Sequence, residues 1–383
     1  MKILQVHKYC NRKRGGGSVT AFFETVRLLE KKGEQVKVFS MKDDRFGEEF
    51  PSENFAEHFD INQPAGVAKK VGLAARSIFN FQAQKSLEKF LAQFQPDIAH
   101  IHNIYHYLTP SIFFTLKKQK IPMVMKLSDY KLICPNYKLF NRGKICQKCR
   151  GGKYYHCFWD RCLKNSSLVS FAAMLEAYCH WILKSYDNID LFLSPSQFMK
   201  DKCVEFGIDP QRIQVLRNTV DEKNFDFFGK TGDSVAGQDY FLYFGRLSPE
   251  KGLTNLIRVV FRLKQSGRLK QRRLLIAGDG PQRKELETLV ERLGLKKEVV
   301  WAGFRQGREL QELIAASQFV ILPSVWFDNS PLVISEAQLL GKAVLVSRLG
   351  GSPEMVEEGK TGWLFDPENE DDFIQKLVFM LEL

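Results

Sequence analysis

The sequence predicts an α/β protein built from two doubly wound, mostly parallel sheets. Short apolar segments rich in β-branched residues alternate with longer segments of helical periodicity along the whole chain. The chain has 383 residues, which is about the length of two domains. A polar, glycine-containing stretch from Asn218 to Gln238 interrupts the alternation near the middle. We therefore place two domains at 1–220 and 221–383, joined by this stretch.

Strand-like segments define the expected sheets. In the first half they lie at Lys2–Val6, Gln35–Ser40, Asp97–His102, Met123–Leu127, Asp190–Ser194 and Ile213–Leu216. In the second half they lie at Tyr240–Phe244, Leu274–Ala277, Val299–Ala302, Phe319–Leu322 and Ala343–Val346. The helices between the latter are expected at about 252–265, 281–293, 307–316 and 331–340, with another beginning near Asp371. Helices between successive strands favour parallel pairing, because each crossover returns the chain to the same sheet edge. We expect Ser18 to cap the helix after the first strand.

Charge is unevenly distributed along the chain. Residues 1–220 contain 34 Lys and Arg against 20 Asp and Glu, a net charge of +14, whereas residues 221–383 carry −2. Thirteen of the basic residues fall within 117–164. Such a segment is typical of surfaces that face anionic lipid, a phosphorylated acceptor or nucleic acid, and also of an ordinary solvated surface. No stacking platform or nucleic-acid docking motif accompanies it, so we expect no nucleic-acid partner.

The apolar segments indicate a cytoplasmic protein. No apolar run approaches the ~18 residues that a bilayer-spanning helix needs. The apolar residues before His7 are too few for the core of a signal peptide. One helical segment, 166–186, carries an apolar stripe of Leu168, Phe171, Leu175, Tyr178 and Ile182. The stripe predicts a helix packed against the sheet or, alternatively, contact with an anionic membrane at its inner face.

Five of the eight cysteines lie in one segment, about 130–165, which we interpret as an insert: Cys134, Cys146, Cys149, Cys157 and Cys162. A chain of this length folds without disulfides, so clustered cysteines favour metal or redox chemistry. Thiolates are common zinc ligands, but these spacings match no standard zinc ribbon. A structural zinc ion that pins the insert, an iron–sulfur or redox role, and unligated thiols are all open interpretations.

The segment from Gly245 to Gly252 has the features of a diphosphate site. It follows a predicted strand and opens a helix. Gly245 lets the backbone approach a ligand, while Arg246 and Lys251 place two cations near the helix N-terminus. Fixed positive charge and free amide groups together bind a diphosphate. A second glycine turn, at Gly278, follows the next strand.

Two carboxylates are expected at the same sheet edge. Asp328 lies in the loop after a predicted strand, and Glu336 lies eight residues later on the following helix. Open α/β sheets bind ligands at the carboxyl ends of their strands, so both side chains are expected to face one cleft. Carboxylates accept hydrogen bonds from the vicinal hydroxyls of a ribose or a hexose.

In this order, the motifs resemble those of glycosyltransferase family 4. The resemblance covers nearly the whole chain and rests on Gly245–Gly252, Ala277–Pro281, Asp328–Glu336, Gly350–Glu354 and Gly359–Gly362. It implies the GT-B fold, in which two Rossmann-like domains face a cleft, the first binding the acceptor and the second a nucleotide sugar. It also implies a retaining mechanism, a UDP- or GDP-linked donor and no cofactor required for catalysis.

The resemblance implies roles for individual residues. Arg246 and Lys251 would stabilise the departing nucleotide, Asp328 would contact the transferred sugar, and Glu336 would bind the ribose hydroxyls. The implied donor contacts are Gly16, Gly17, Gly245, Gly278, Asn329, Ser330, Pro331, Leu332 and Val333. Candidates on the acceptor side, at predicted strand ends, are His102, His106, Ser128 and Asp129. Each histidine is also compatible with a structural or solvent-facing role.

Three features depart from the family pattern. Asp328 stands where Glu is common, Ser128 stands where members often carry His, and the chain stops at Leu383, before the helix that usually crosses back onto the first domain. We expect a retaining hexosyltransferase that extends a cell-surface polysaccharide, with a saccharide or lipid-linked acceptor. The alternatives are a non-catalytic glycosyltransferase, degenerate or truncated, and a basic zinc-containing binding protein.

Overall fold

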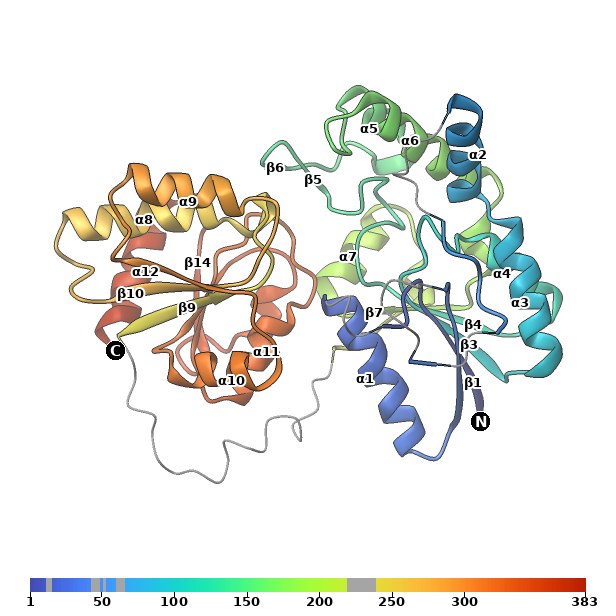
Figure 1. Ribbon diagram of the computed structural model, residues 1–383, viewed down its shortest axis with the longest axis horizontal. Coiled ribbons are helices and arrows are strands. Elements are labelled where there is room, and N and C mark those ends of the chain that lie inside the picture. The colour runs from blue at the N-terminus through green and yellow to red at the C-terminus, as the bar shows by residue number, and fades with distance from the viewer. Residues whose placement is uncertain (12–15, 43–48, 51–52, 60–65, 219–238) are drawn as a thin grey trace. The chain divides into compact units, whose positions relative to one another are not determined.

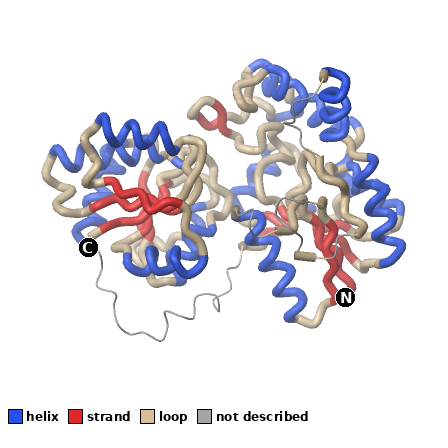
Figure 2. Tube along the Cα trace, in the orientation of Figure 1, coloured by secondary structure: helices blue, strands red, loops and turns tan. Residues whose placement is uncertain are grey.

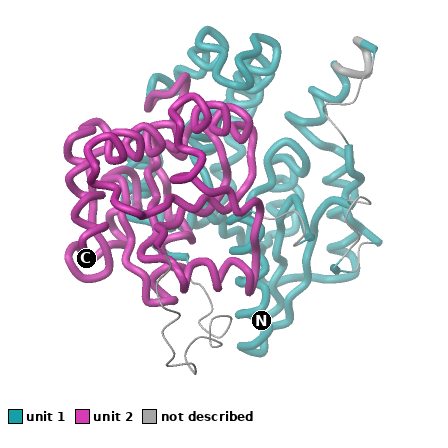
Figure 3. The backbone as a smooth tube through the Cα atoms, turned by 60° about the vertical axis from the view of Figure 1, so that its left-hand side comes forward, with its two compact units in different colours: residues 1–139, 147–219 teal, residues 140–146, 220–383 magenta. Residues whose placement is uncertain are grey.

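The chain forms two compact units, Met1–Leu139 with Gln147–Thr219, and Phe140–Cys146 with Val220–Leu383 (Figure 3). The computed structural model describes residues 1–11, 16–42, 49–50, 53–59, 66–218 and 239–383. Apart from Asn218, the expected linker lies outside the described residues. Each unit contains a six-stranded sheet whose neighbouring strands are all parallel. The prediction of two doubly wound α/β domains is therefore confirmed.

The first unit is built around a sheet with the strand order β2-β1-β3-β4-β7-β8 (Figure 1). Its strands are β1 (Lys2–Val6), β2 (Gln35–Phe39), β3 (Ile98–Ile101), β4 (Met123–Lys126), β7 (Leu191–Ser194) and β8 (Ile213–Val215). Its helices are α1 (Gly17–Lys31), α2 (Val67–Ile78), α3 (Phe81–Gln93), α4 (Ser111–Lys118), α5 (Tyr155–Trp159), α6 (Ser167–Ile182) and α7 (Gln197–Glu205). The strand order reverses between β1 and β3, which is where open sheets of this kind bind ligands.

The second unit is built around a sheet with the order β11-β10-β9-β12-β13-β14. Its strands are β9 (Tyr240–Phe244), β10 (Arg273–Ala277), β11 (Val299–Gly303), β12 (Val320–Leu322), β13 (Val344–Ser347) and β14 (Gly362–Phe365). Its helices are α8 (Leu253–Gln265), α9 (Arg283–Arg292), α10 (Gly307–Ala316), α11 (Leu332–Leu339) and α12 (Glu370–Glu382). A small hairpin, β5 (Phe140–Asn141) and β6 (Lys144–Ile145), groups with this unit. Here the order reverses between β9 and β12.

Helices cover both faces of the second sheet, which explains its apolar strands (Figure 2). All five residues of β9 are buried, and they alternate between two cores. Phe241 and Tyr243 pack with residues of α8, α9 and α12, whereas Leu242 and Phe244 pack with residues of α10 and α11. Burial of each such side chain contributes about 1.5–3 kcal/mol. A strand buried on both faces therefore has a continuous apolar sequence.

Two expectations about local structure are wrong, and three strands, β5, β6 and β14, were not predicted. Gly16, with a φ of 95°, caps α1 in place of Ser18, because glycine adopts this left-handed conformation without strain. Strand β14 pairs with β13 and was not predicted from its short sequence. The predicted helix over 166–186 exists as α6, but its apolar stripe faces solvent and does not pack against the sheet.

Candidate functional site

Loops that follow four strands meet at the carboxyl edge of the second sheet. A Cβ on Gly278, after β10, would overlap the backbone oxygen of Gly245, after β9. A Cβ on Gly350, after β13, would overlap the backbone oxygen of Asp328, after β12. Both positions therefore require glycine. The close backbone packing brings the predicted donor residues together where the strand order reverses.

Lys251 and Asp328, predicted separately, form an ion pair. Lys251 ends a short 3-10 turn after β9, and Asp328 is only 6% exposed. The Lys251 Nζ atom lies 2.8 and 2.9 Å from the two carboxylate oxygens. Ser324 Oγ donates to Asp328 Oδ2 at 2.5 Å, and the ammonium lies 5.5 Å from the centroid of the Trp326 ring. The lysine charge is thus held in one position, as recognition of an anion requires.

The turn after β9 also carries Arg246, whose side chain is exposed. Tyr243 Oη donates to the carbonyl oxygen of Arg246 at 2.8 Å and holds the turn. Gly252 then opens α8 with a φ of 72°, where a Cβ would overlap the backbone oxygen of Pro323. Two cations therefore stand directly before the N-terminal amide groups of α8, an arrangement suited to a diphosphate.

Glu336 is a half-buried carboxyl on α11. Its burial raises its pKa to about 7. Within the described residues it forms no hydrogen bond or ion pair. The other predicted contacts of this region lead into α11 or open it: Asn329, Ser330, Pro331, Leu332 and Val333. A desolvated carboxyl of this kind is suited to accept hydrogen bonds from a ligand.

Gly16 and Gly17 lie at the N-terminus of α1 in the first unit. Gly16 occupies the capping position, and no side chain caps the helix. The Val19 and Thr20 amides donate to the Gly16 carbonyl oxygen, and the positive end of the helix dipole lies at Gly16 and Gly17, in keeping with the role implied for both glycines.

His102 is a core residue, so the hypothesis that it contacts an acceptor is wrong. It is 1% exposed, and its Nε2 atom lies 2.8 Å from Gln5 Oε1. Its ring packs against those of His100 and Phe22, with centroid distances of 4.3 and 5.2 Å. Burial, assisted by His100, holds its pKa well below the usual value. His102 is therefore neutral and inaccessible.

The other acceptor-side candidates follow β3 and β4. His106 Nδ1 lies 3.5 Å from Glu176 Oε2, and burial lowers the pKa of His106 to about 4, so the ring is neutral at pH 7. Asp129 Oδ1 accepts a hydrogen bond of 2.9 Å from the Lys131 amide. Burial raises the pKa of Asp129 above its usual value. Ser128 precedes it and is half-buried.

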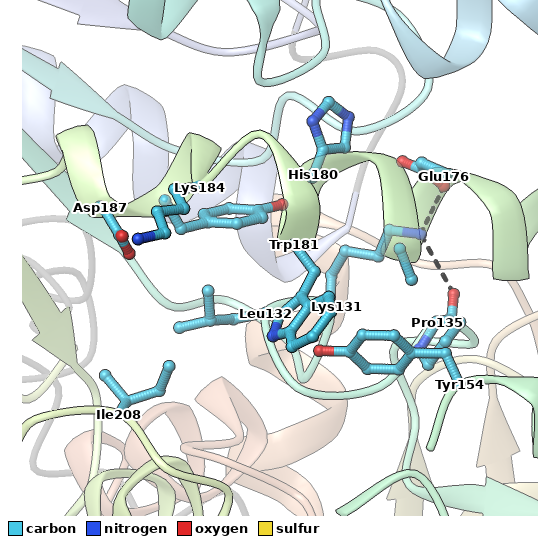
Figure 4. A pocket seen from close by; sticks show the side chains of 12 residues that line it. Lys131, Leu132, Pro135, Tyr154, Glu176, His180, Trp181, Lys184, Asp187 and Ile208 are labelled. Carbon is cyan, nitrogen blue, oxygen red and sulfur yellow. Dashed lines mark hydrogen bonds and ion pairs between the residues drawn. The ribbon is translucent and has the colours of Figure 1, made fainter. Parts of the chain in front are cut away.

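A pocket of about 120 Å³ that was not predicted from the sequence lies beside α6 (Figure 4). Lys131 Nζ lies 2.7 Å from Glu176 Oε2 and 3.2 Å from the carbonyl oxygen of Pro135. Burial by itself raises the pKa of Glu176, but Lys131 and His106 outweigh it and lower the pKa. Tyr154, Trp181, Lys184 and Asp187 are among the other lining residues. Lys131 and Glu176 are 45 residues apart in sequence. The one feature of the sequence that pointed to this ion pair was Glu176 itself, a glutamate opposite the apolar stripe of its helix.

Four of the five cysteines of the segment lie close to one another. The Cys157 thiol hydrogen-bonds to Cys162 and interacts electrostatically with Cys149 and Cys134, but not with Cys146, which directly follows β6. Cys134 Sγ also donates to Asn136 Oδ1 at 3.0 Å. Among the described residues, no three His, Cys, Asp or Glu side chains are arranged to hold a metal ion. Zinc binding thus stays a prediction, and elemental analysis of the purified protein tests it.

Two family comparisons cover most of the chain. Residues 16–219 match the glycosyl transferase 4-like domain, and residues 226–383 match the glycosyl transferases group 1. An uncharacterized glycosyltransferase of Methanocaldococcus jannaschii is 28% identical over 281 residues, 70% of each chain.

Two further relatives are similar over about half of the chain and about half of their own length. The N-acetylgalactosamine-N,N'-diacetylbacillosaminyl-diphospho-undecaprenol 4-alpha-N-acetylgalactosaminyltransferase of Campylobacter jejuni is 29% identical over 199 residues, 51% of this chain and 52% of its own. The UDP-Gal:alpha-D-GlcNAc-diphosphoundecaprenol alpha-1,3-galactosyltransferase of Escherichia coli is 29% identical over 188 residues, 47% of this chain and 48% of its own.

Solved structures share the fold at low sequence identity. The lipopolysaccharide outer core galactosyltransferase WaaB has a TM-score of 0.63 and 18% identity. Anabaena HepE in complex with UDP and glucose has a TM-score of 0.59 and 20% identity. Each comparison covers 100% of this chain and 90% of the other.

Proposed function

Since this chain belongs to the 4-like and group 1 glycosyltransferases and has the GT-B fold, we propose that it is a retaining hexosyltransferase. It moves a hexose from a UDP- or GDP-linked donor to a saccharide carried on a lipid diphosphate, at the cytoplasmic face of the membrane. The product extends a cell-surface polysaccharide. Support comes from relatives whose acceptors are undecaprenol-diphosphate saccharides and from a fold neighbour bound to UDP and glucose.

The observation that carries this proposal is the Lys251–Asp328 ion pair at the carboxyl edge of the second sheet. In the reaction, an acceptor hydroxyl oxygen bonds to the anomeric carbon and its proton passes to Asp129. The bond between the anomeric carbon and the terminal phosphate oxygen of the nucleotide breaks, and negative charge develops on that phosphate oxygen. Lys251, held by Asp328, and Arg246 stabilise this charge. Because both cations are in place before the reaction, little reorganisation is needed. In this proposal, catalysis consists of positioning and leaving-group stabilisation, and requires no metal ion.

Asp328 and Asp129 contribute in different ways. The carboxylate of Asp328 retains acceptor positions beyond its bonds to Lys251 and Ser324, and these suit a hydroxyl of the transferred sugar. In the first unit, burial raises the pKa of Asp129, which makes it a stronger proton acceptor than an exposed aspartate. We assign three residues to the acceptor side: Asp129, its neighbour in sequence Ser128, and His106, which follows the adjacent strand β3.

Thermal unfolding with UDP, GDP and ADP at matched concentrations tests the donor site. One nucleotide is expected to stabilise the protein by roughly 2.7 kcal/mol at 100 times its dissociation constant. For a protein of this size the unfolding midpoint then rises by a few degrees. The effective nucleotide selects the sugar donors for an activity screen. If none of the three shifts the midpoint, the non-catalytic alternative replaces the proposal.

UDP or GDP binding is expected to strengthen as pH rises through 7. The Glu336 carboxyl, with a pKa of about 7, is mainly protonated at pH 6 and mainly ionised at pH 8, and only the carboxylate accepts from both ribose hydroxyls. The affinity is therefore expected to rise by up to about tenfold between these values. Calorimetric titration measures it. Glu336→Gln separates this effect from titration of the nucleotide's own phosphate: if the variant shows the same pH dependence as the wild type, Glu336 is not the group responsible.

A further inference from the structure

Helix α6 exposes its apolar side and buries its polar side. Leu168, Trp181 and Ile182 are 82, 62 and 70% exposed. Its buried residues are Ser170, Ala173, Glu176 and His180. A surface helix of a soluble protein has the reverse arrangement, because burial of the apolar side drives its packing.

Polar contacts fix α6 in this orientation. Ser170 Oγ accepts a hydrogen bond of 3.0 Å from the Leu163 amide. Glu176 forms the buried ion pair with Lys131, and both ring nitrogens of His180 are hydrogen-bonded. Rotation of the helix to bury its apolar stripe would separate all of these partners. The exposed stripe is therefore a built feature of the fold.

Helix α5 lies against α6 and enlarges the exposed area (Figure 1). The rings of Phe158 and Phe171 are 5.6 Å apart, and the Tyr155 amide donates to Tyr178 Oη at 3.3 Å. Trp159, at the end of α5, is 70% exposed. We define the apolar surface as Trp159, Leu168, Phe171, Leu175, Trp181 and Ile182. Several exposed apolar side chains on two packed helices are typical of an interaction surface.

The segment that carries the apolar surface is basic. Within 147–184 the exposed cations are Lys148, Arg150, Lys153, Arg161, Lys164 and Lys184. Six lysines and arginines outnumber the two acids of this segment, Asp160 and Glu176, although Lys148 and Arg150 are themselves paired, with Asp160 and Glu205. The net charge of the segment is therefore positive. Its charge complements an anionic partner, and tryptophan at the edge of an apolar surface is typical of a lipid interface.

We propose that α5 and α6 dock the protein on an anionic lipid bilayer, with the apolar surface inserted among the headgroups. The role of this docking, access to a lipid-linked acceptor, rests on the proposed function. Trp181 and Lys184 also line the pocket of Lys131 and Glu176, so that pocket lies beside the docked helix end. In the described part of the chain, every helix is too short or too polar to cross a bilayer. Docking is therefore interfacial, as for other amphipathic helices.

Vesicle flotation of the full chain tests this proposal. We expect the protein to float with vesicles of 70% phosphatidylcholine and 30% phosphatidylglycerol, and to float less as the salt concentration rises. The variant Leu168→Ser/Phe171→Ser/Ile182→Ser is expected to lower the partition coefficient at least about tenfold. Leu168 and Ile182 are largely exposed, and loss of the ring contact between Phe171 and Phe158 is expected to lower the unfolding midpoint only slightly. The matched control is Phe81→Ser/Phe379→Ser, two exposed phenylalanines outside the apolar surface, which is expected to float like the wild type.

Three results would overturn the proposal: no flotation of the wild type, equal flotation of the triple-serine variant and the wild type, or equal loss in the control. A wild-type dimer that the triple-serine variant converts to a monomer, in light scattering without vesicles, would show that a second copy covers the surface. The nucleotide shift is measured on the same preparations. If the protein does not float but a nucleotide still raises its unfolding midpoint, only the docking proposal is contradicted. If it floats but no nucleotide raises the midpoint, only the proposed transferase activity is contradicted.

Discussion

Lys251→Ala is expected to lower kcat/KM for sugar transfer by about 10²- to 10³-fold, which is the usual effect of removing one preorganised charge-stabilising group. Lys251 Nζ is held by both oxygens of Asp328 and by its place over Trp326, so its charge has a fixed position that the exposed side chain of Arg246 does not supply. Because the charge on the leaving phosphate grows in the transition state, kcat is expected to fall by a larger factor than the affinity for the intact donor.

Steady-state kinetics with the donor chosen by the nucleotide screen measure this effect. The matched control is Lys297→Ala, an exposed lysine at the amino edge of the same sheet, which is expected to retain wild-type kinetics. Thermal unfolding shows whether Lys251→Ala remains folded, since the change leaves the carboxylate of Asp328 with Ser324 as its remaining side-chain donor. A folded Lys251→Ala protein with wild-type kcat/KM would refute the assignment.

Lys131→Met is expected to lower the free energy of unfolding by about 3–5 kcal/mol, because it leaves a buried charge without its partner. Both side chains of the Lys131–Glu176 pair are 4% exposed. Glu176 Oε1 has no hydrogen-bond partner in the described structure, so no second bond to this carboxylate compensates for the loss of the Lys131 ammonium. His106, with a pKa lowered to about 4, is neutral at pH 7 and carries no replacement charge.

Urea denaturation at pH 7 measures this loss. The double variant Lys131→Met/Glu176→Leu is expected to recover most of it, because replacing both members of a buried pair by apolar residues is often neutral. The loss in Lys131→Met is also expected to shrink as pH falls, because Glu176 then takes up a proton and is no longer charged. A single variant as stable as the wild type would mean that solvent or His106 satisfies Glu176.

The donor half of the candidate site could be predicted because its signals are local. Gly245–Gly252 and Gly278 follow strands with clear apolar patterns, and at Gly252 and Gly278 a Cβ would overlap a backbone oxygen, so both positions require glycine. The acceptor half could not be predicted as well. His102 lies at the end of a strand, where catalytic residues are often found. Its contacts with Gln5 and Phe22 nevertheless place it in the core. That environment comes from other strands and helices, which the local sequence does not specify.

The sequence alone determined the fold class, the strand segments apart from β5, β6 and β14, and the loops that carry Arg246, Lys251, Asp328 and Glu336. These depend on apolar periodicity, glycine positions and charge, which act over a few neighbouring residues. Only the tertiary structure decided which side of α6 is buried, that Lys251 pairs with Asp328, and that Lys131 pairs with Glu176. Each of these depends on contacts between residues distant in sequence. For α6 the periodicity located a helix and an apolar stripe, but buried polar bonds, and not the stripe, set its orientation.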